Sequence, residues 1–379
     1  MRRALERVEI AGEHAARERA WRVSAAAFAE RQPVRHRDRR RLVPAIAIVV
    51  AGAVMAATLS SPGRALLRSI RETVGVKGAR SALFSLPTSG ALLVHSDGGV
   101  WVVQADGSKR RLGAYRSASW SPNGLYVAAT RRNALYALTP GGEERWSLAR
   151  PRVAFPSWTG SRTDSRIAYA DKSGLHVVAG DGTGDRFVAP AENGPFAWRT
   201  GSLRELAYVS ASEVRLQDVQ TGRVVWRANR GPVEPVLTVS WSGDGKRLLV
   251  LAAHALRVYD EHGRLVRRND PADGTIYADA AFVPGTHRLA VIRSHGAQSD
   301  VFLFPGGPVL FHGTGALRQL AWSPDGSWLL VTWPSADQWV LLRVVPGGAT
   351  KRIRAVANIS AQFRSQSFPR VEGWCCAQP

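Results

Sequence analysis

Cysteine is nearly absent from this sequence of 379 residues, which holds only two. They are adjacent, Cys375 and Cys376, so they cannot build a disulfide framework or a four-cysteine zinc site. Neighbouring cysteines also seldom bond to each other. The last four residues, "CAQP", share the spacing of a prenylation box, but glutamine and proline are the wrong residue types for one.

Catalytic motifs are missing as well. The sequence has no Gly-x-Ser-x-Gly elbow, no His-Glu-x-x-His zinc motif and no glycine-rich phosphate loop ending in lysine. Nine histidines are scattered without ligand spacing. We expect His176 inside a strand and His254 in the loop before another, both in structural roles. We therefore predict no enzymatic activity, no catalytic or metal-binding residues, and no cofactor.

Turn-forming and aromatic residues are abundant: 36 glycines, 21 prolines and 13 tryptophans. This composition favours short strands joined by turns over long helices. We therefore expect an all-β protein. The length leaves room for one large repeat domain with additional segments.

One uncharged hydrophobic run, "LVPAIAIVVAGAVMAATL" from Leu42 to Leu59, divides the chain. It is long enough to cross a hydrocarbon core of about 30 Å as a helix. Residues 1–41 hold twelve arginines against six acidic residues, an excess that favours the cytoplasmic side. We predict a basic cytoplasmic tail over 1–41, a single transmembrane helix over 42–60 in the cytoplasmic membrane, and the rest outside. A cleaved signal peptide and a buried core helix are the alternatives.

Short helical segments are expected on both sides of this span. In the tail, Trp21, Ala25 and Phe28 lie at helical spacing, where they could contact a cytoplasmic partner or the inner membrane surface. After the span, residues 61–81 form an amphipathic stem.

The formal net charge of +21 is spread along the chain: +6 on residues 1–41, +4 on 61–80 and +11 on 81–379. Such basicity often indicates nucleic-acid binding. Outside the membrane, anionic lipid headgroups or acidic wall polymers are the available counter-charges, but an ordinary solvated surface is the favoured explanation of the charge. We predict no nucleic-acid partner.

A motif of an aromatic residue, a turn and an apolar run recurs after residue 81. It is clearest in "AWSPDGSWLLV", and its aromatic positions are Phe84, Trp120, Trp158, Trp198, Trp241, Phe282 and Trp322. From Trp120 onward they are spaced by 38, 40, 43, 41 and 40 residues. A period near 40 fits four short strands per unit, which is one blade of a β-propeller. We expect the recurring aromatic, Trp322 included, to be buried between blades.

The "WSPDG" turn followed by an apolar strand resembles the WD-repeat-like propeller repeats of the TolB type, over about residues 82–357. The likeness is strongest at Trp120–Gly124, Trp241–Gly245 and Trp322–Gly326. The Trp-Asp dipeptide of true WD repeats is absent. The order of basic tail, span, stem and propeller also resembles membrane-anchored propeller proteins of high-GC actinobacteria, which implies a fold and a topology but no activity.

Seven aromatic positions predict seven blades, each with four strands, and six blades are the alternative if the weak Phe84 unit only extends the stem. The tail 358–379 then remains, and its Trp374 lies 52 residues past Trp322, too far for the regular spacing. Because an open ring would expose sheet edges and an apolar blade face, we expect this tail to pack on the propeller near the first unit.

The strongest metal candidate is "GDGTGD", Gly180–Asp185, in which Asp181, Thr183 and Asp185 resemble alternating calcium ligands. Aligned on the repeat, this segment coincides with five other turns between third and fourth strands. A hairpin explains every copy, and calcium explains one.

Three functions are compatible with these features. The first is a membrane-anchored binding or scaffolding module whose partner is a protein or a cell-envelope polymer. The second is a signal transducer that couples an outside sensor to a cytoplasmic regulator in the manner of anti-sigma factors, although residues 1–41 hold no cysteine for a zinc-binding pattern. The third is an enzyme of the lactonase or lyase kind with its site in the channel. Carboxylates and histidines clustered at the channel mouth would favour the enzyme.

Overall fold

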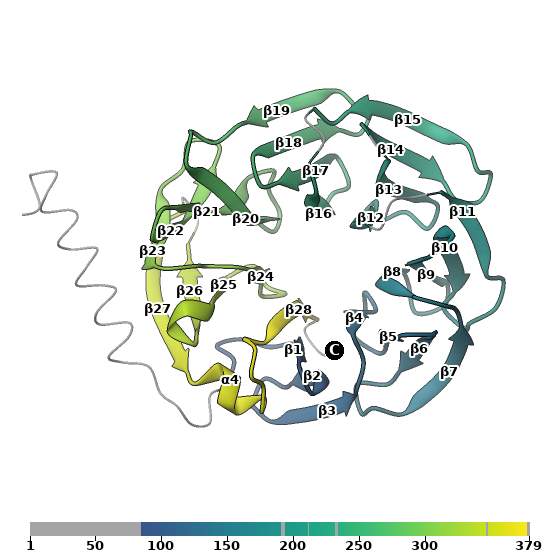
Figure 1. Cartoon of the computed structure of the whole chain (residues 1–379), viewed down its shortest axis with the longest axis horizontal. Coiled ribbons are helices and arrows are strands. Elements are labelled where there is room, and N and C mark those ends of the chain that lie inside the picture. Colours follow the sequence, from purple (N-terminus) through teal and green to yellow (C-terminus); the bar gives the residue numbers. More distant parts are fainter. Residues whose placement is uncertain (1–84, 191–193, 211, 232–233, 346–347, 377–379) are drawn as a thin grey trace, which may run out of the picture. The chain divides into compact units, whose positions relative to one another are not determined.

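The computed structural model describes residues 85–190, 194–210, 212–231, 234–345 and 348–376. Within them, seven four-stranded antiparallel sheets form a ring around a central channel (Figure 1). The prediction of an all-β, seven-bladed propeller is confirmed, and the six-bladed alternative is wrong. We number the blades 1 to 7 in chain order.

Every blade has an innermost strand at the channel, followed outward by three more strands. The innermost strands of blades 1 to 7 are β28 (Arg370–Cys375), β4 (Ser117–Trp120), β8 (Ala154–Gly160), β12 (Phe196–Trp198), β16 (Val236–Trp241), β20 (Thr275–Phe282) and β24 (Leu320–Trp322). The second strands are β1 (Ala91–Ser96), β5 (Val127–Arg131), β9 (Ser165–Asp171), β13 (Glu205–Ser210), β17 (Arg247–Ala252), β21 (Leu289–His295) and β25 (Trp328–Trp333).

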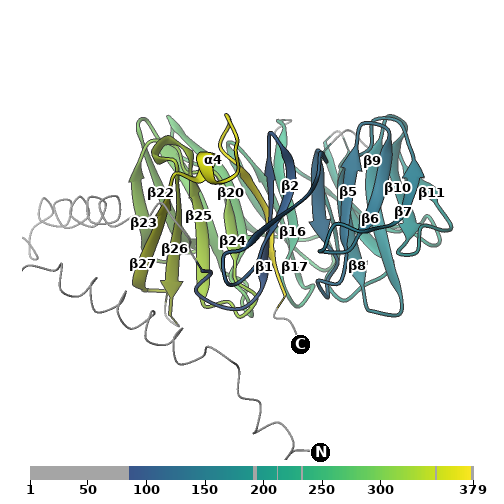
Figure 2. The same cartoon turned by 90° about the horizontal axis from the view of Figure 1, so that it is seen from below.

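The outer half of each blade is built in the same order. The third strands are β2 (Gly99–Val103), β6 (Ala134–Leu138), β10 (Gly174–Ala179), β14 (Glu213–Asp218), β18 (Ala255–Asp260), β22 (Gln298–Phe304) and β26 (Gln338–Val344). The outermost strands are β3 (Lys109–Gly113), β7 (Glu144–Ala149), β11 (Arg186–Ala189), β15 (Val224–Asn229), β19 (Leu265–Asn269), β23 (Val309–Thr314) and β27 (Thr350–Ala357). A 3₁₀ turn, η1 (Pro334–Ala336), and a short helix, α4 (Ile359–Gln362), complete the described elements, and Figure 2 shows α4 at one face of the ring.

The Ser-Pro-Asp-Gly motif forms the turn between the innermost and second strands. In blade 7, the hydroxyl of Ser323 donates to Asp325 Oδ1 at 2.6 Å and accepts a hydrogen bond from the backbone N–H of Trp328 at 2.9 Å. Gly326 has φ +68°, which favours glycine. The equivalent serines of blades 2 and 5, Ser121 and Ser242, make the same pair of hydrogen bonds. The motif is therefore a turn that sets the register of its blade.

Hydrophobic residues form seven clusters, one between each pair of neighbouring blades. Each cluster includes or contacts one aromatic residue from the end of an innermost strand, which explains why the motif repeats. Trp158, Trp198 and Trp241 are buried as expected. Trp322 is only partly buried against the cluster between blades 6 and 7. The expectation that Trp322 packs between blades is therefore met in its position, but its side chain is only partly buried there.

The ring closes through the C-terminal segment. β28 pairs antiparallel with β1, and Trp374 lies opposite Leu92, so Trp374 occupies the position that the recurring aromatic takes in the other blades. The first sequence unit therefore supplies three strands, and the expectation that every unit supplies four is wrong. Phe84, the expected first aromatic, lies outside the described residues. The irregular spacing of Trp374 arises because α4 and its flanking loop precede β28.

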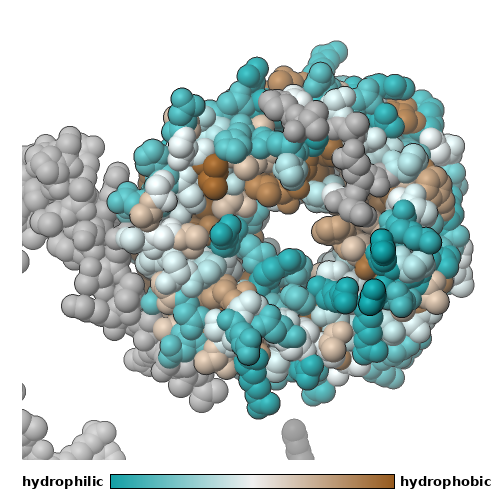
Figure 3. All heavy atoms as spheres, viewed as in Figure 1, coloured by the Kyte–Doolittle hydropathy of each residue, from teal (hydrophilic) through white to brown (hydrophobic). Residues whose placement is uncertain are grey.

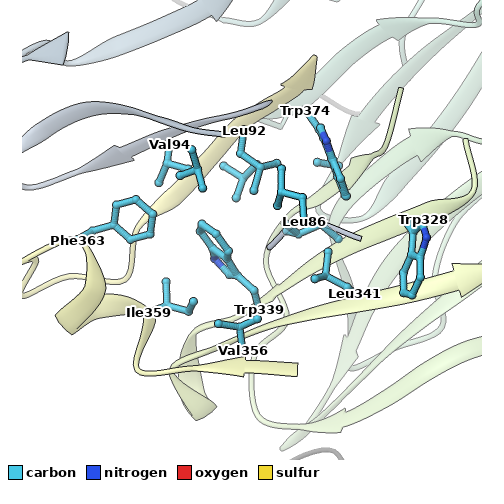
Figure 4. Packing of buried hydrophobic residues seen from close by; sticks show 14 residues of the cluster. Leu86, Leu92, Val94, Trp328, Trp339, Leu341, Val356, Ile359, Phe363 and Trp374 are labelled. Atoms are coloured by element: carbon cyan, nitrogen blue, oxygen red, sulfur yellow. The ribbon is translucent and has the colours of Figure 1, made fainter. Parts of the chain in front are cut away.

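The core at this seam is shared by blades 7 and 1 (Figure 4). Trp339, from β26, is fully buried, and its ring centroid lies 5.4 Å from that of Phe363. Phe363 and Ile359, on and beside α4, are also fully buried. The segment between the last blade and β28 is thus anchored by apolar contacts before it reaches the channel.

Cys375 and Cys376 are joined by a disulfide at the end of β28. Adjacent cysteines seldom bond to each other, and this pair is an exception. The pair lies against the turn that follows β4, since Cys376 Sγ is 3.2 Å from the carbonyl oxygen of Pro122. In the fold, the tail brings these two residues together with blade 2.

The predicted tail 1–41, transmembrane helix 42–60 and stem 61–81 lie outside the described residues. Among the helices that the structure does describe, none has the length and apolar character needed to cross a membrane.

Candidate functional site

The wall of the central channel is made by the innermost strands. Each pairs on only one side among the described residues, so its other edge carries backbone N–H and C=O groups without a strand partner. Figure 3 shows the channel open through the middle of the ring. The channel therefore offers exposed backbone as well as side chains.

A cavity of about 900 Å³ opens into this channel beside blades 1 to 4. Its wall includes residues of four innermost strands, β28, β4, β8 and β12, and of the connections that precede them. A volume of this size falls in the range of ordinary ligand sites.

Four arginines line the cavity, and they come from four separate places. Arg116 lies between β3 and β4, Arg132 in the turn between β5 and β6, Arg152 between β7 and β8, and Arg370 at the start of β28. All four are exposed. Figure 3 shows hydrophilic residues gathered on the channel rim near β28 and β4.

Only one carboxylate, that of Glu372, lies among the described residues that line this cavity, and no histidine does. Glu372 Oε1 accepts a hydrogen bond from Arg370 Nη2 at 2.9 Å. Burial raises the pKa of Glu372, and the charge of Arg370 partly opposes that rise. Within the described part of the chain, Arg116, Arg132 and Arg152 have no carboxylate partner. The cavity therefore carries an excess of positive charge.

Two residues at the start of blade 3 adopt an unusual backbone conformation, Arg152 in the connection before β8 and Phe155 within β8. Arg152 has φ +57° and Phe155 has φ +52°, a region that non-glycine residues seldom occupy and that is least favourable for bulky ones. Phe155 is also 45% exposed. It lies in a bulge, because three residues of β8 span the distance of two in β9. An exposed aromatic side chain is thus held at the cavity at a conformational cost.

The opposite wall of the channel contains a different kind of polar residue. Asp279, in β20, accepts hydrogen bonds from the backbone N–H of Leu320 in β24 at 2.9 Å and from the hydroxyl of Thr238 in β16 at 3.1 Å. Burial raises the pKa of Asp279 to about 6. Through these hydrogen bonds the Asp279 carboxylate joins three blades.

The two histidines considered from the sequence lie away from the cavity. His176 is buried in β10, stacks on Tyr169 with ring centroids 5.3 Å apart, and has Nε2 2.8 Å from Ser173 Oγ. His254 lies just before β18, and its Nδ1 is 3.1 Å from Glu234 Oε2. The structure does not bring them together.

The residues of the calcium-like segment also serve separate contacts. Asp181 accepts hydrogen bonds from the backbone N–H and the hydroxyl of Thr183, which forms a turn. Asp185 accepts from Arg150 Nε at 2.9 Å and from the Tyr169 hydroxyl at 2.5 Å. Among all described residues, no group of three or more histidine, cysteine, aspartate or glutamate side chains is arranged to hold a metal ion.

Sequence reasoning missed the cavity arginines and Asp279. A signal for some of them exists, because Arg116, Arg318 and Arg370 each lie four residues before a recurring tryptophan. Aligning the repeats on that position places arginines at the start of several innermost strands. No comparable signal identifies Phe155 or Asp279, whose roles depend on contacts between blades.

No protein-family model and no curated protein matches this sequence. Among solved structures, a chain of the mitotic checkpoint complex is 14% identical, with a TM-score of 0.51 over 73% of this chain and 85% of that one. Hydrazine synthase of Kuenenia stuttgartiensis is 13% identical, with a TM-score of 0.49 over 60% and 75%. The β-propeller domain of Cps50 (Swd1) from Myceliophteria thermophila is 14% identical, with a TM-score of 0.48 over 64% and 86%. At these identities, the likeness extends to the fold alone.

Proposed function

We propose that this chain is a binding or scaffolding module that holds its partner at the cavity beside blades 1 to 4. A propeller fold hosts many activities, so the proposal rests on the site. Its main support is one cavity that combines an exposed phenylalanine with three arginines that have no carboxylate partner within the described part of the chain. Arginine and aromatic residues are enriched at the centres of protein interfaces.

The composition of the cavity also favours binding over catalysis. General acid–base and nucleophilic sites need groups that can exchange a proton or attack a substrate near neutral pH. The described lining offers one carboxylate, already paired with an arginine, and no histidine. Guanidinium groups stay charged and act by positioning and binding anions.

We further propose that the module is anchored in the cytoplasmic membrane by residues 42–60, with the propeller outside the cytoplasm. Support comes from the uncharged run Leu42–Leu59 and the arginine excess before it. Alkaline phosphatase fused after Gly63 or Pro379 should be active, and a fusion at Gln32 should be inactive. Activity at Gln32 alone would reverse the proposed orientation.

Crosslinking in intact membranes tests the binding role. A photoreactive amino acid placed at Asn133, beside Arg132 on the exposed turn, should capture a specific partner. The same amino acid at Lys351, exposed on outermost strand β27, is the matched control. The expected result is a product from Asn133 that Lys351 does not give and that the double variant Arg116→Gln/Arg152→Gln abolishes. Identical products from both positions, or none from Asn133, would contradict a partner at this cavity.

A further inference from the structure

We propose that the cavity recognises an acidic peptide segment of a partner protein, one in which carboxylates alternate with apolar side chains. This inference rests on the proposed binding function and adds the chemistry of the partner. It is carried by the charge of the cavity, the distribution of its arginines, its apolar wall and its free strand edges.

Charge selects an anionic ligand. Arg116, Arg132 and Arg152 have no carboxylate partner among the described residues, and Glu372 is occupied by Arg370. A guanidinium group can donate two parallel hydrogen bonds to one carboxylate, which makes it suited to this group. An incoming carboxylate would therefore meet donors that no internal acid already holds.

The placement of the arginines selects an extended ligand with several anionic groups. They arise from the β3–β4 connection, the β5–β6 turn, the β7–β8 connection and the start of β28. These four segments belong to blades 1, 2 and 3 and their junctions. A single small anion could reach only part of this set, whereas a chain with spaced carboxylates can contact several.

The apolar part of the cavity wall indicates that the ligand carries apolar groups as well as anionic ones. Phe155 is 45% exposed in the left-handed backbone region, so the fold maintains both strain and an uncovered aromatic ring here. Pro156, Pro195 and Phe196 line the same cavity. A ligand with apolar side chains would cover the exposed ring of Phe155, and a polyphosphate would leave that ring uncovered.

Free strand edges supply the contact that distinguishes a peptide from other anions. β4 pairs only with β5, and β8 pairs only with β9, among the described strands. Their channel-facing edges can form main-chain hydrogen bonds with an extended peptide, as in β-strand addition. Together with alternating carboxylate and apolar side chains, this geometry favours a protein segment over a phosphate polymer.

Binding can be measured with the full chain in detergent micelles. The probe is a fluorescent ten-residue peptide that alternates glutamate with leucine, followed by anisotropy. Two other probes are a peptide with glutamine in place of every glutamate and inorganic polyphosphate of equal charge as a competitor. We expect saturable binding of the glutamate peptide, no measurable binding of the glutamine peptide, and weaker binding as salt rises.

Variants connect that binding to the cavity. Arg116→Gln/Arg152→Gln should lower the affinity for the glutamate peptide by about tenfold or more, and Phe155→Ala should lower that affinity by a smaller factor. The matched control is Arg267→Gln/Arg352→Gln, which removes two exposed arginines from outermost strands β19 and β27 and should leave the affinity within about twofold of the parent.

Several results would overturn the inference. These are no binding of the glutamate peptide, equal binding of both peptides, an equal loss in the control double variant, or polyphosphate binding that shows the same sensitivity to Phe155→Ala. The last result would assign the cavity to polyanions in general. A partner captured by crosslinking at Asn133 that lacks an acidic segment would leave the binding function intact and reject only the acidic peptide.

Discussion

On one side of the central channel, β16, β20 and β24 are joined by Asp279, whose oxygens accept hydrogen bonds from both neighbouring blades. On the other side, Arg116 and Arg152, in the connections that precede β4 and β8, have no carboxylate partner among the described residues, and Phe155 of β8 has an exposed aromatic ring. Both walls are made by innermost strands at equivalent places in the repeat. The two walls differ in their polar groups. On the first wall these groups form hydrogen bonds between blades. On the second, the arginines without carboxylate partners among the described residues are available to bind a ligand.

This difference indicates how a symmetric fold acquires one binding site. Buried polar groups that bridge elements stabilise a fold, because leaving them unpaired is costly. Exposed charges without partners contribute little to stability. We therefore expect substitutions on the Asp279 wall to change the free energy of unfolding and substitutions of cavity arginines to change mainly binding.

The largest effect should follow from removing β28, the one cavity strand that comes from the end of the chain. Truncation after Val356 deletes α4, Phe363 and Trp374, and so uncovers the edge of β1 and the seam core. The loss should be a large part of a total stability of about 5–15 kcal/mol. Circular dichroism melts of both proteins in the same detergent measure it. Equal melting temperatures would show that the tail does not close the ring.

The two walls each provide one recurring tryptophan for a matched comparison. Trp374 on β28 is buried, and Trp322 on β24 is only partly buried. Trp374→Ala should cost about 3–5 kcal/mol as a large-to-small core substitution, and Trp322→Ala about 1–3 kcal/mol. Urea unfolding gives both values. A larger loss at Trp322 would contradict the burial difference between the seam and the blade 6–7 interface.

The pH dependence of stability should reveal Asp279. Its folded pKa of about 6 lies above the usual 3.8, so between these values the folded state binds more protons than the unfolded state. Its contribution to the free energy of unfolding therefore falls as pH rises from about 4 to 6, by about 3 kcal/mol in total, and is constant above that range.

The variant Asp279→Asn cannot titrate, so subtracting its stability profile isolates this effect from other acids. Subtraction is needed because other acids also titrate. At Asp325, partial burial raises the pKa, but side-chain and backbone hydrogen bonds outweigh it and lower the pKa to about 2. The contribution of Asp325 to the free energy of unfolding therefore rises with pH, at lower pH than the Asp279 effect. Parallel profiles for the parent and Asp279→Asn between pH 4 and 7 would show that this carboxylate is not held as described.

A smaller effect of opposite sign is expected at Phe155 on the cavity wall. Phe155→Gly relieves the left-handed backbone at φ +52° and should raise the free energy of unfolding by about 1 kcal/mol. Phe155→Ala keeps the strain and is the control for loss of the ring. Denaturant titrations of the parent and the two variants measure this difference. A glycine variant less stable than the parent would mean that the packing of Phe155 contributes more to stability than its backbone strain costs.

The smallest effect should come from the arginines themselves. Arg116→Gln/Arg152→Gln removes two exposed charges that have no carboxylate partner among the described residues. We expect the free energy of unfolding to stay within about 0.5 kcal/mol of the parent. The same denaturant titration measures it. A loss above about 2 kcal/mol would give these arginines a structural role and remove the contrast between the two walls.

Much of the fold could be predicted because each repeat encodes its own turn and strands locally. Ser323, Asp325 and Gly326 lie within four residues and form a turn that any copy of the motif can make. The first blade could not be predicted in the same way. Its innermost strand comes from residues 370–375, and the pairing of Trp374 with Leu92 joins segments 282 positions apart, for which the local pattern holds no information.

The site was less predictable than the fold for a related reason. Arg116, Arg152 and Arg370 are ordinary surface residues in the sequence, and they form a cavity only because blades 1 to 3 are neighbours. The calcium-like segment had the stronger local pattern, yet Asp181 completes a turn and Asp185 holds Arg150 and Tyr169. Local patterns identify turns well, and they do not report which side chains from distant repeats converge.

By itself, the sequence determined an all-β ring of repeated blades and favoured seven over six, since a period near 40 residues and a recurring aromatic with its turn encode one sheet after another. Only the tertiary structure decided that the C-terminal tail supplies the innermost strand of blade 1, and which channel wall is left open to a ligand. Closure depends on a strand edge at β1 meeting a segment from the opposite end of the chain. The open wall depends on whether a polar group finds a partner across blades, as Asp279 does and Arg116 does not among the described residues.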